Sequence, residues 1–393
     1  MELFLFIFCL ISSFIFPLVG VIVSGVSVAT VKKQSRVLLI LFVLVLGYIF
    51  SFYLPSYTDD MTRYIGYMSS ISGYTFIGFI KQLFSPQPIN IYGLNGQEWP
   101  GSAVLLFIAA KLGSYRILSA LTLIFTYIVR LKFIQDSWTD SKKQGYYILW
   151  FLIIILWVRP LLPLSGFRWF IAISCIMLSL SFENRYGFKK RYIFLYLLAA
   201  LFHPGSIIFS GLRFVSFLFN LNRKRTIIFL SISIILLFVA SRNQLISAYV
   251  QELLSHFSDY SDNEWNKFQS ISRILSATMM ALLLARSFSV LKSAQITIFE
   301  RRLLVYLNIL IIFNLCLIWH PSFNRLSQFT IVIGLLLLSK SYFNKDKREY
   351  KDLLIPAAAV LIGLILMFYY PKTSFPDFIE PLTRILVSPI HFT

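Results

Sequence analysis

Ionisable side chains beside long apolar runs are the residues of this chain best suited to chemistry. Such groups are costly at or within a membrane, so each of them is a candidate for function. Four segments that are far apart in the sequence carry them: SYTDDMTRY, RPLLPLSGFRW, LFHPGS and WHPSFNRLSQF. The candidates are Asp59, Asp60, Arg63, Arg159, Arg168, His203, His320 and Arg325.

The arginines favour binding of an anion that contains phosphate. A guanidinium group stays charged and forms bidentate hydrogen bonds to phosphate oxygens. Arg168 and Arg325 each begin an apolar run, as expected for paired cations that hold a buried pyrophosphate. In the alternative, these arginines reach to lipid headgroups or pair with Asp59 or Asp60. That alternative is stronger for Arg159.

Asp60 and His203 are the candidates for proton transfer. Asp60 and Arg63 are three residues apart and share one face of a helix, so a structural ion pair explains them as well as a catalytic role does. In the catalytic role, Asp60 accepts a proton or holds a sugar while Arg63 meets phosphate. His203 and His320 precede proline, where a histidine is often a capping or packing residue. Two histidines without a carboxylate are a weak metal signal, and we expect no metal or cofactor.

The elements that must position these residues are apolar helices, which predicts an all-α integral membrane protein. Of the 393 residues, 58% are hydrophobic and 13% are charged. A helix of about 20 residues crosses a hydrocarbon layer of about 30 Å, and backbone groups in that layer must pair within the helix. The runs also lack the alternation of barrel strands. The three cysteines lie in apolar runs and are expected to pack there.

The net charge of +19 follows membrane topology and does not indicate a nucleic acid partner. More than half of the 36 Lys and Arg lie in short loops between apolar runs, and the positive-inside rule places these loops in the cytoplasm. This predicts one membrane domain over residues 1–393, about 12 transmembrane helices, both termini outside, and outer loops 55–100 and 242–270. The expected spans are 3–23, 37–54, 101–132, 146–158, 168–182, 188–203, 205–220, 226–241, 271–290, 303–319, 326–342 and 353–370.

Three local features qualify this topology. Residues 101–132 are long for one span and contain Gly113, so Gly101 to Leu112 is a candidate half-helix. The stretch 188–220 is either two helices or one helix kinked at Pro204. Residues 74–84 form an amphipathic piece suited to the membrane interface.

The topology brings the ionisable candidates to one membrane depth, which predicts a shared outward-opening cavity. Aromatic residues near this cavity could stack on sugars: Tyr57, Tyr64, Tyr67, Tyr92, Trp99 and Trp169.

The order of short motifs resembles a known family. An early D-x-x-R-Y (Asp60, Arg63, Tyr64) precedes SGFRWFIAIS, which contains Arg168; LAALFH and NRLSQF follow. Over residues 55–342 this order is similar to the EpsG branch of the Wzy-type polysaccharide polymerases. Trp169 stands where that family commonly has Gln.

The resemblance implies a GT-C-like membrane glycosyltransferase in the bacterial cytoplasmic membrane. Its substrate would be oligosaccharide repeat units on undecaprenyl pyrophosphate, joined at the outer face to make O-antigen, lipopolysaccharide or exopolysaccharide. Membrane lipid and a chain-length regulator are candidate partners. Arg168 and Arg325 would bind the leaving pyrophosphate with Arg63 assisting, and either Asp60 or His203 would be the base. The other substrate-binding candidates are Asp59, Tyr64, Arg159 and His320.

Other readings remain open. A flippase or transporter for the same lipid-linked sugars would favour internal repeats, which we do not find in the sequence. An O-antigen ligase would favour a larger outer domain than loop 242–270. A membrane acyltransferase would depend on a histidine beside a carboxylate, so substitution of His203 distinguishes it from a polymerase that depends on Arg168 and Arg325.

Overall fold

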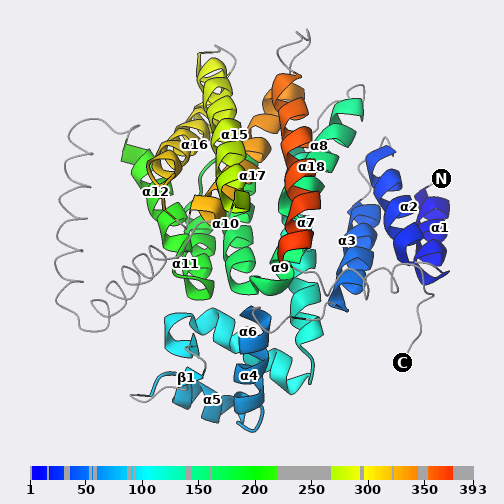
Figure 1. Cartoon of the computed structure of the whole chain (residues 1–393), viewed down its shortest axis with the longest axis vertical. Helices are drawn as coiled ribbons and strands as arrows, with labels where there is room; N and C mark the ends of the chain where they lie inside the picture. Colours follow the sequence, from blue (N-terminus) through cyan, green and yellow to red (C-terminus); the bar gives the residue numbers. More distant parts are fainter. Residues whose placement is uncertain are drawn as a thin grey trace. The chain divides into compact units, whose positions relative to one another are not determined.

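The computed structural model is helical in nearly all of the residues that it describes, and this confirms the all-α fold class (Figure 1). One antiparallel ladder, β1 (Asn90–Ile91) with β2 (Leu94–Asn95), interrupts the helices in the described part. The described residues are 2–15, 17–30, 36–52, 55, 60–85, 90–91, 94–137, 144–159, 161–218, 267–292, 296–320, 323–343 and 353–374.

The chain forms two compact units. Unit 1 contains Met1–Leu178, Leu197–His203 and Ser339–Thr393, and unit 2 contains Ser179–Tyr196 and Pro204–Leu338. Each unit is built from several separate stretches of the chain, so neither corresponds to a simple half of the sequence. That the whole chain acts as one membrane domain stays a prediction.

Unit 1 is built around α3 and α7, which pack closely. A Cβ atom at Gly47 of α3 would lie 2.6 Å from Ile124 Cγ1, so a glycine is what permits this approach of the two helices. The helices α8 and α18 also pack together, and Trp157 Nε1 donates to the Ala359 carbonyl oxygen at 2.9 Å. The elements of unit 1, apart from β1 and β2, are α1 (Glu2–Ile15), α2 (Pro17–Thr30), α3 (Arg36–Ser51), α4 (Asp60–Ile71), α5 (Phe76–Leu83), η1 (Gly96–Glu98), α6 (Pro100–Lys111), α7 (Tyr115–Ser137), α8 (Gln144–Val158), α9 (Leu161–Ser165), the first part of α10 (Phe167–Tyr186), the last part of α11 (Ile193–Phe202), the end of α17 (Phe323–Phe343) and α18 (Leu354–Ser374).

The single span predicted for residues 3–23 is wrong, because the structure has two helices there. The Cys9 Sγ and Ser27 Oγ atoms lie 3.4 Å apart, whereas 18 residues of continuous helix would separate them by about 27 Å. The helices α1 and α2 therefore fold back on each other. Pro17, the first residue of α2, explains the break, since proline lacks an N–H donor and clashes with the preceding turn.

Two other interruptions were predicted correctly. The helix α6 ends at Lys111 and α7 starts at Tyr115, with Gly113 at a φ of 72°, a conformation that favours glycine. The helix α11 ends at Phe202 and α12 begins at Ser206, so the stretch around Pro204 separates two helices. The amphipathic piece is also a helix: α5 buries Phe79 and Leu83 and exposes Phe76 and Ile77.

Unit 2 is held together by polar contacts as well as by apolar packing. Tyr306 Oη in α16 donates to the Phe209 carbonyl oxygen of α12 at 3.1 Å. Asn314 Nδ2 in α16 donates to Thr330 Oγ1 in α17 at 2.9 Å. A Cβ at Gly334 would lie 2.9 Å from Leu283 Cδ1 of α15. The elements of unit 2 are the second part of α10, η3 (Lys190–Tyr192), the start of α11, α12 (Ser206–Leu218), α15 (Lys267–Leu291), α16 (Ile298–Cys316) and most of α17.

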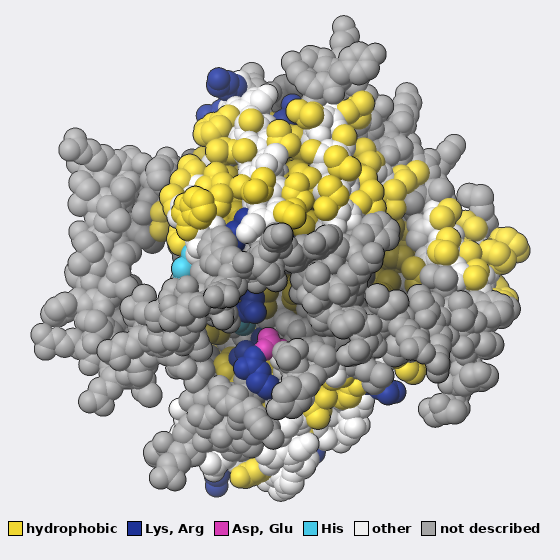
Figure 2. Space-filling model, in the orientation of Figure 1, with side chains coloured by type: hydrophobic (Ala, Val, Ile, Leu, Met, Phe, Trp, Pro, Cys, Tyr) yellow, Lys and Arg dark blue, Asp and Glu magenta, His cyan; other side chains and the backbone are white. Residues whose placement is uncertain are grey.

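The helices have the surface of a membrane protein. In the described part, Tyr115–Ser137 and Ser270–Leu291 are long and apolar enough to cross a membrane, and several shorter apolar helices accompany them. Figure 2 shows hydrophobic side chains over much of the described helix surface. Exposed examples are Phe194, Ile274 and Trp319, which are 65%, 66% and 79% exposed. The number of twelve spans stays a prediction, and the span 226–241 and most of loop 242–270 lie outside the described residues.

Candidate functional site

Arg168 is the centre of a site in unit 1. It is the second residue of α10, and its guanidinium contacts two aromatic rings. The guanidinium carbon is 4.7 Å from the Trp99 ring centroid and 5.2 Å from that of Tyr64. Arg168 Nε also donates to Tyr64 Oη at 2.9 Å. Two cation–π contacts and one hydrogen bond therefore fix the plane of this guanidinium.

The aromatic rings that support Arg168 are buried. Tyr64 is 1% exposed and meets Phe167 edge to face at 4.8 Å, and Trp99 is 2% exposed and contacts Tyr67 at 5.6 Å. Burial leaves the rings of Tyr64, Tyr67 and Trp99 no free face for a sugar. The sequence-based expectation of sugar stacking therefore has to be corrected for these three residues, since their rings pack against the protein.

The two tyrosines are protonated phenols at neutral pH. Burial raises the pKa of the Tyr64 hydroxyl, and the neighbouring Arg168 guanidinium opposes part of that increase. Burial also raises the pKa of Tyr67 to about 12. Neither hydroxyl can therefore serve as a general base at physiological pH.

A tight turn sets the position of Trp99. The β1–β2 hairpin leads into η1, whose first residue, Gly96, lies directly against Tyr67. A Cβ at Gly96 would be 2.5 Å from Tyr67 Oη and 2.7 Å from Leu83 Cδ1. A larger residue here would have to displace both side chains, so Gly96 permits the close approach of η1 that leaves Trp99 beside Tyr67.

His203 lies in the same region of unit 1 as Arg168. Ser102 Oγ in the first turn of α6 donates to the Phe202 carbonyl oxygen at 2.8 Å, so the beginning of α6 lies against the end of α11. His203 follows directly, and its ring meets Trp169 at 4.8 Å with an interplanar angle of 67°. Since Trp169 is next to Arg168 and Trp99 precedes α6, one small region contains Arg168, Trp169 and His203.

Asp60 and Arg63 form the ion pair that their spacing allowed. Asp60 is the first residue of α4, and its Oδ1 accepts from Arg63 Nη2 within the same helix. The Arg63 side chain is 51% exposed and that of Asp60 is 30% exposed, so both are open to a ligand. Arg63 precedes Tyr64, which places this pair next to the aromatic support of Arg168. Asp59 lies outside the described residues.

Arg159 is buried and has an unusual backbone. It is 9% exposed, so little of its side chain is accessible at the surface of the protein. Its φ of 47° is in the left-handed region, which costs a non-glycine residue about 1–3 kcal/mol. Such strain is often found at functional positions, and it is consistent with a conformation set by the surrounding packing.

Arg325 and His320 belong to unit 2. Arg325 is an exposed residue in the first turn of α17, which agrees with its predicted place at the beginning of a helix. His320 lies just after α16, where its N–H donates to the Leu317 carbonyl oxygen at 2.8 Å. That these two residues share a cavity with Arg168 stays a prediction.

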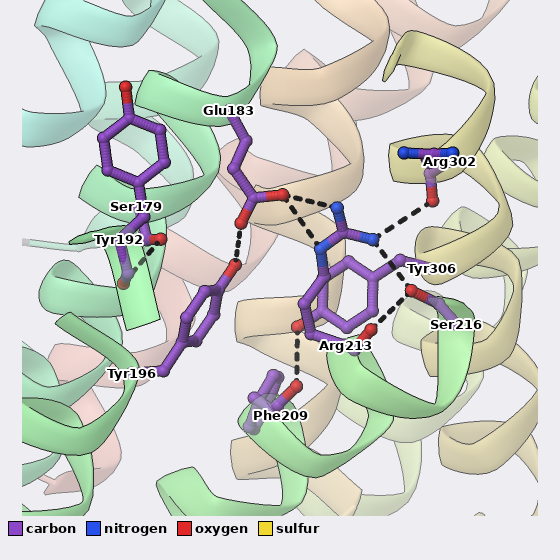
Figure 3. A network of polar contacts seen from close by, with 9 residues as sticks. All are labelled: Ser179, Glu183, Tyr192, Tyr196, Phe209, Arg213, Ser216, Arg302 and Tyr306. Carbon is purple, nitrogen blue, oxygen red and sulfur yellow. Dashed lines mark hydrogen bonds and ion pairs between the residues drawn. The ribbon is translucent and has the colours of Figure 1, made fainter. Parts of the chain in front are cut away.

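Sequence reasoning missed a buried ion pair in unit 2 (Figure 3). Glu183 of α10 and Arg213 of α12 are 0% and 2% exposed in their side chains. The carboxylate accepts from Arg213 Nε at 3.1 Å and from Tyr196 Oη at 2.7 Å, and Arg213 Nη1 donates to Ser216 Oγ at 2.8 Å. The available signal was a carboxylate and an arginine within otherwise apolar runs.

Arg130 of α7 is a second missed residue. It is 1% exposed, and its Nη1 donates to the Thr126 carbonyl oxygen at 2.6 Å and to Ser174 Oγ of α10 at 2.9 Å. It therefore fastens the helix that carries Arg168 to α7. Among the described residues, no group of three or more His, Cys, Asp or Glu could hold a metal ion.

Comparison with models of known protein families identifies a family for this chain. The EpsG family model matches residues 36–380, which include every candidate site residue. Searches of the curated proteins and of the solved structures found no significant match. The match covers most of the chain and agrees with the resemblance carried by the D-x-x-R-Y, FRW and NRLSQF motifs. The apolar helices of the chain and this match indicate a membrane protein of polysaccharide biosynthesis. The chain belongs to the EpsG family.

Proposed function

We propose that this protein is a GT-C-like glycosyltransferase that polymerises oligosaccharide repeat units. The donor is a growing chain on undecaprenyl pyrophosphate at the outer face of the cytoplasmic membrane, and the acceptor is a terminal sugar hydroxyl of a new unit. The acceptor oxygen bonds to the anomeric carbon of the donor. The bond from that carbon to the pyrophosphate oxygen breaks, and the lipid pyrophosphate leaves as an anion.

The observation that carries this proposal is the state of the Arg168 guanidinium. Its Nε is bound to Tyr64, whereas neither Nη atom hydrogen-bonds to any residue in the described part of the chain. The side chain is partly exposed, so these two donors are available to a ligand. A guanidinium already fixed by Trp99 and Tyr64 loses little freedom when it binds a diphosphate oxygen pair. Such preorganised charge stabilises a departing anion most effectively.

The remaining candidates have supporting roles in this proposal. Arg63 assists in neutralising the diphosphate from its exposed position on α4, and Arg325 supplies the second full cation. Arg159 and His320 stay candidates for substrate binding. Tyr64 holds Arg168 and is a positioning residue.

The base is either Asp60 or His203. The Asp60 carboxylate is half-exposed and next to Arg63, so it can accept a proton while Arg63 moves to phosphate. The His203 imidazole is half-buried against Trp169 in the region of Arg168. Both have access to a hydroxyl that approaches the Arg168 site, and substitution by Asn and Gln respectively distinguishes them.

The test is the length distribution of the polysaccharide made by cells that carry substituted protein. We expect Arg168→Ala and Arg168→Lys to abolish polymer while single repeat units remain, because lysine has neither the fork nor the plane that stacks. Arg116→Ala is the matched control, since Arg116 also stacks on an aromatic ring, Phe52 at 5.5 Å, but is exposed and outside the site. Normal chain lengths with Arg168→Ala at normal protein levels would refute the proposal.

A further inference from the structure

A small recess in unit 2 joins the loop after α10 to the beginning of α16. It is lined by Glu183, Phe188, Arg213, Phe299, Arg302 and Leu303. The approach is close, since a Cβ at Gly187 would lie 2.8 Å from the Phe299 ring, and Gly187 has a φ of 72°. Phe188 also meets Phe217 of α12 at 4.7 Å. Three helices and one connection therefore shape this recess.

The recess has an uncompensated positive charge. The Arg213 guanidinium is paired with Glu183, and its Nη1 reaches the Arg302 carbonyl oxygen at 3.4 Å. Arg302, by contrast, forms no ion pair with a described residue, and its Nε is enclosed without a hydrogen-bond acceptor in the described part of the chain. The Arg302 side chain is partly exposed, and a guanidinium without a carboxylate partner favours binding of an anion.

The surface around the recess is strongly basic. Glu300, the acidic residue nearest in sequence to Arg302, caps its own helix by accepting from the Thr297 N–H and Thr297 Oγ1 at 2.9 Å each. Five basic residues at the end of α10, in the connection to α11 and at the beginning of α16 are exposed: Arg185, Lys189, Lys190, Arg191 and Arg301.

Apolar groups are exposed beside these charges. Tyr186, Ile298 and Phe299 are 50%, 68% and 45% exposed, and Arg185 and Lys189 lie over the Tyr186 ring at 5.1 and 5.6 Å. A free phosphate would need only the cations. Exposed aromatic and aliphatic groups next to the cations fit a ligand that carries both phosphate and acyl chains.

We propose that the exposed surface at this recess binds the phosphodiester of an anionic glycerophospholipid, with the partly exposed Arg302 as its main contact. The basic residues of the α10–α11 connection surround the headgroup, and the acyl chains lie along Phe299 and Ile298. By the positive-inside rule this lipid belongs to the cytoplasmic leaflet. The site lies in unit 2 and uses none of the residues proposed for glycosyl transfer, so the two proposals can fail separately.

The experiment compares full-length protein in nanodiscs of phosphatidylcholine with and without phosphatidylglycerol. Binding is measured by native mass spectrometry and by the thermal unfolding midpoint. We expect phosphatidylglycerol to bind and to raise the midpoint for the wild type. For Arg302→Gln we expect affinity about tenfold weaker, as for the loss of one charge-assisted contact. Arg301→Gln is the matched control, because it removes the same charge from an exposed neighbour outside the lined recess.

Three results would overturn the proposal. Equal losses for Arg301→Gln and Arg302→Gln would indicate diffuse attraction to an acidic bilayer. Equal stabilisation of the wild type by inorganic phosphate or glycerol phosphate would indicate a site for a soluble anion. Unchanged lipid affinity in Arg302→Gln would exclude Arg302 as the contact. Should Arg302→Gln fail to fold, Arg302→Lys replaces it and is expected to weaken binding by losing the Nε donor.

Discussion

At the scale of single residues, the important distinction is between side chains that meet a ligand and side chains that hold them. Arg168 is suited to the first role because two aromatic rings hold its guanidinium and neither terminal nitrogen hydrogen-bonds to a described residue. Tyr64 is suited to the second because it is buried and its hydroxyl accepts from Arg168. The motif D-x-x-R-Y therefore combines an exposed cation at Arg63 with a buried support at Tyr64.

The supporting role of Tyr64 predicts a graded effect. Tyr64→Phe keeps the ring and removes the acceptor of Arg168 Nε, so we expect polymerisation to fall about tenfold, equivalent to about 1.4 kcal/mol of lost transition-state stabilisation. The loss should appear in kcat more than in KM, measured with purified protein and lipid-linked repeat units. Tyr67→Phe is the control, since Tyr67 makes no hydrogen bond to Arg168 in the structure. Equal effects of the two substitutions would contradict this role.

At the scale of elements, close approaches and buried polar pairs decide which helices meet. Gly96 brings η1 against Tyr67, Gly47 brings α3 against α7, and Arg130 ties α7 to α10. The Glu183–Arg213 pair joins α10 and α12 in unit 2, with Tyr196 of α11 as a third partner. Each device acts between segments distant in sequence, and together they set the helix ends on which the candidate residues lie.

Gly96→Ala tests the turn that positions Trp99. The new methyl group would overlap Tyr67 Oη, so we expect a loss of about 1–3 kcal/mol in stability, as for overpacking, together with reduced polymer. Combining it with Tyr67→Phe should recover part of both losses by removing the overlapping hydroxyl. Gly73→Ala is the control, because a Cβ at Gly73 meets no atom within 4 Å. An unchanged unfolding midpoint in Gly96→Ala would refute this account.

Removing one partner of the buried Glu183–Arg213 pair should destabilise the fold strongly, whereas replacing both partners by apolar residues should destabilise it much less. Glu183→Ala leaves the Arg213 charge buried without its carboxylate, and we expect a loss of about 3–5 kcal/mol. Glu183→Leu with Arg213→Met should be clearly more stable than either single substitution. The measurement is thermal unfolding followed by thiol exposure, since Cys9 and Cys175 are buried.

A partly exposed ion pair within one helix provides the comparison for that experiment. Lys132 and Asp136 are four residues apart on α7 and are 30% and 18% exposed in their side chains. Asp136→Ala should therefore cost less than about 1 kcal/mol, as is usual for such pairs. If the Glu183 and Asp136 substitutions cost the same, burial is not what makes the Glu183–Arg213 pair important.

At the scale of the whole molecule, charge distribution predicts orientation. Basic connections such as Arg185 to Arg191 are expected on the cytoplasmic side, and the segment that holds α4, α5 and α6 is expected outside. If this predicted orientation holds, we expect the Arg168 site toward the outer face and the recess at Arg302 toward the inner face.

Cysteine labelling tests this orientation. In a Cys316→Ser background, which removes the exposed native thiol, Ser72→Cys and Lys189→Cys each add one exposed cysteine. A maleimide that cannot cross membranes should label Ser72→Cys in intact cells and label Lys189→Cys only after the membrane is opened. Labelling of both positions in intact cells would show that the predicted topology is wrong.

The amino-acid sequence was enough to predict the helical class, the breaks at Gly113 and near Pro204, and the family, because hydropathy, glycine and proline act locally and the motifs are short. It did not determine the fold-back of α1 onto α2, which hydropathy alone reads as one apolar run. It also did not show the support of Arg168 by Tyr64 and Trp99 or the pairing of Glu183 with Arg213. These contacts join residues 30 to 104 positions apart, and only the packing of whole helices decides which side chains meet.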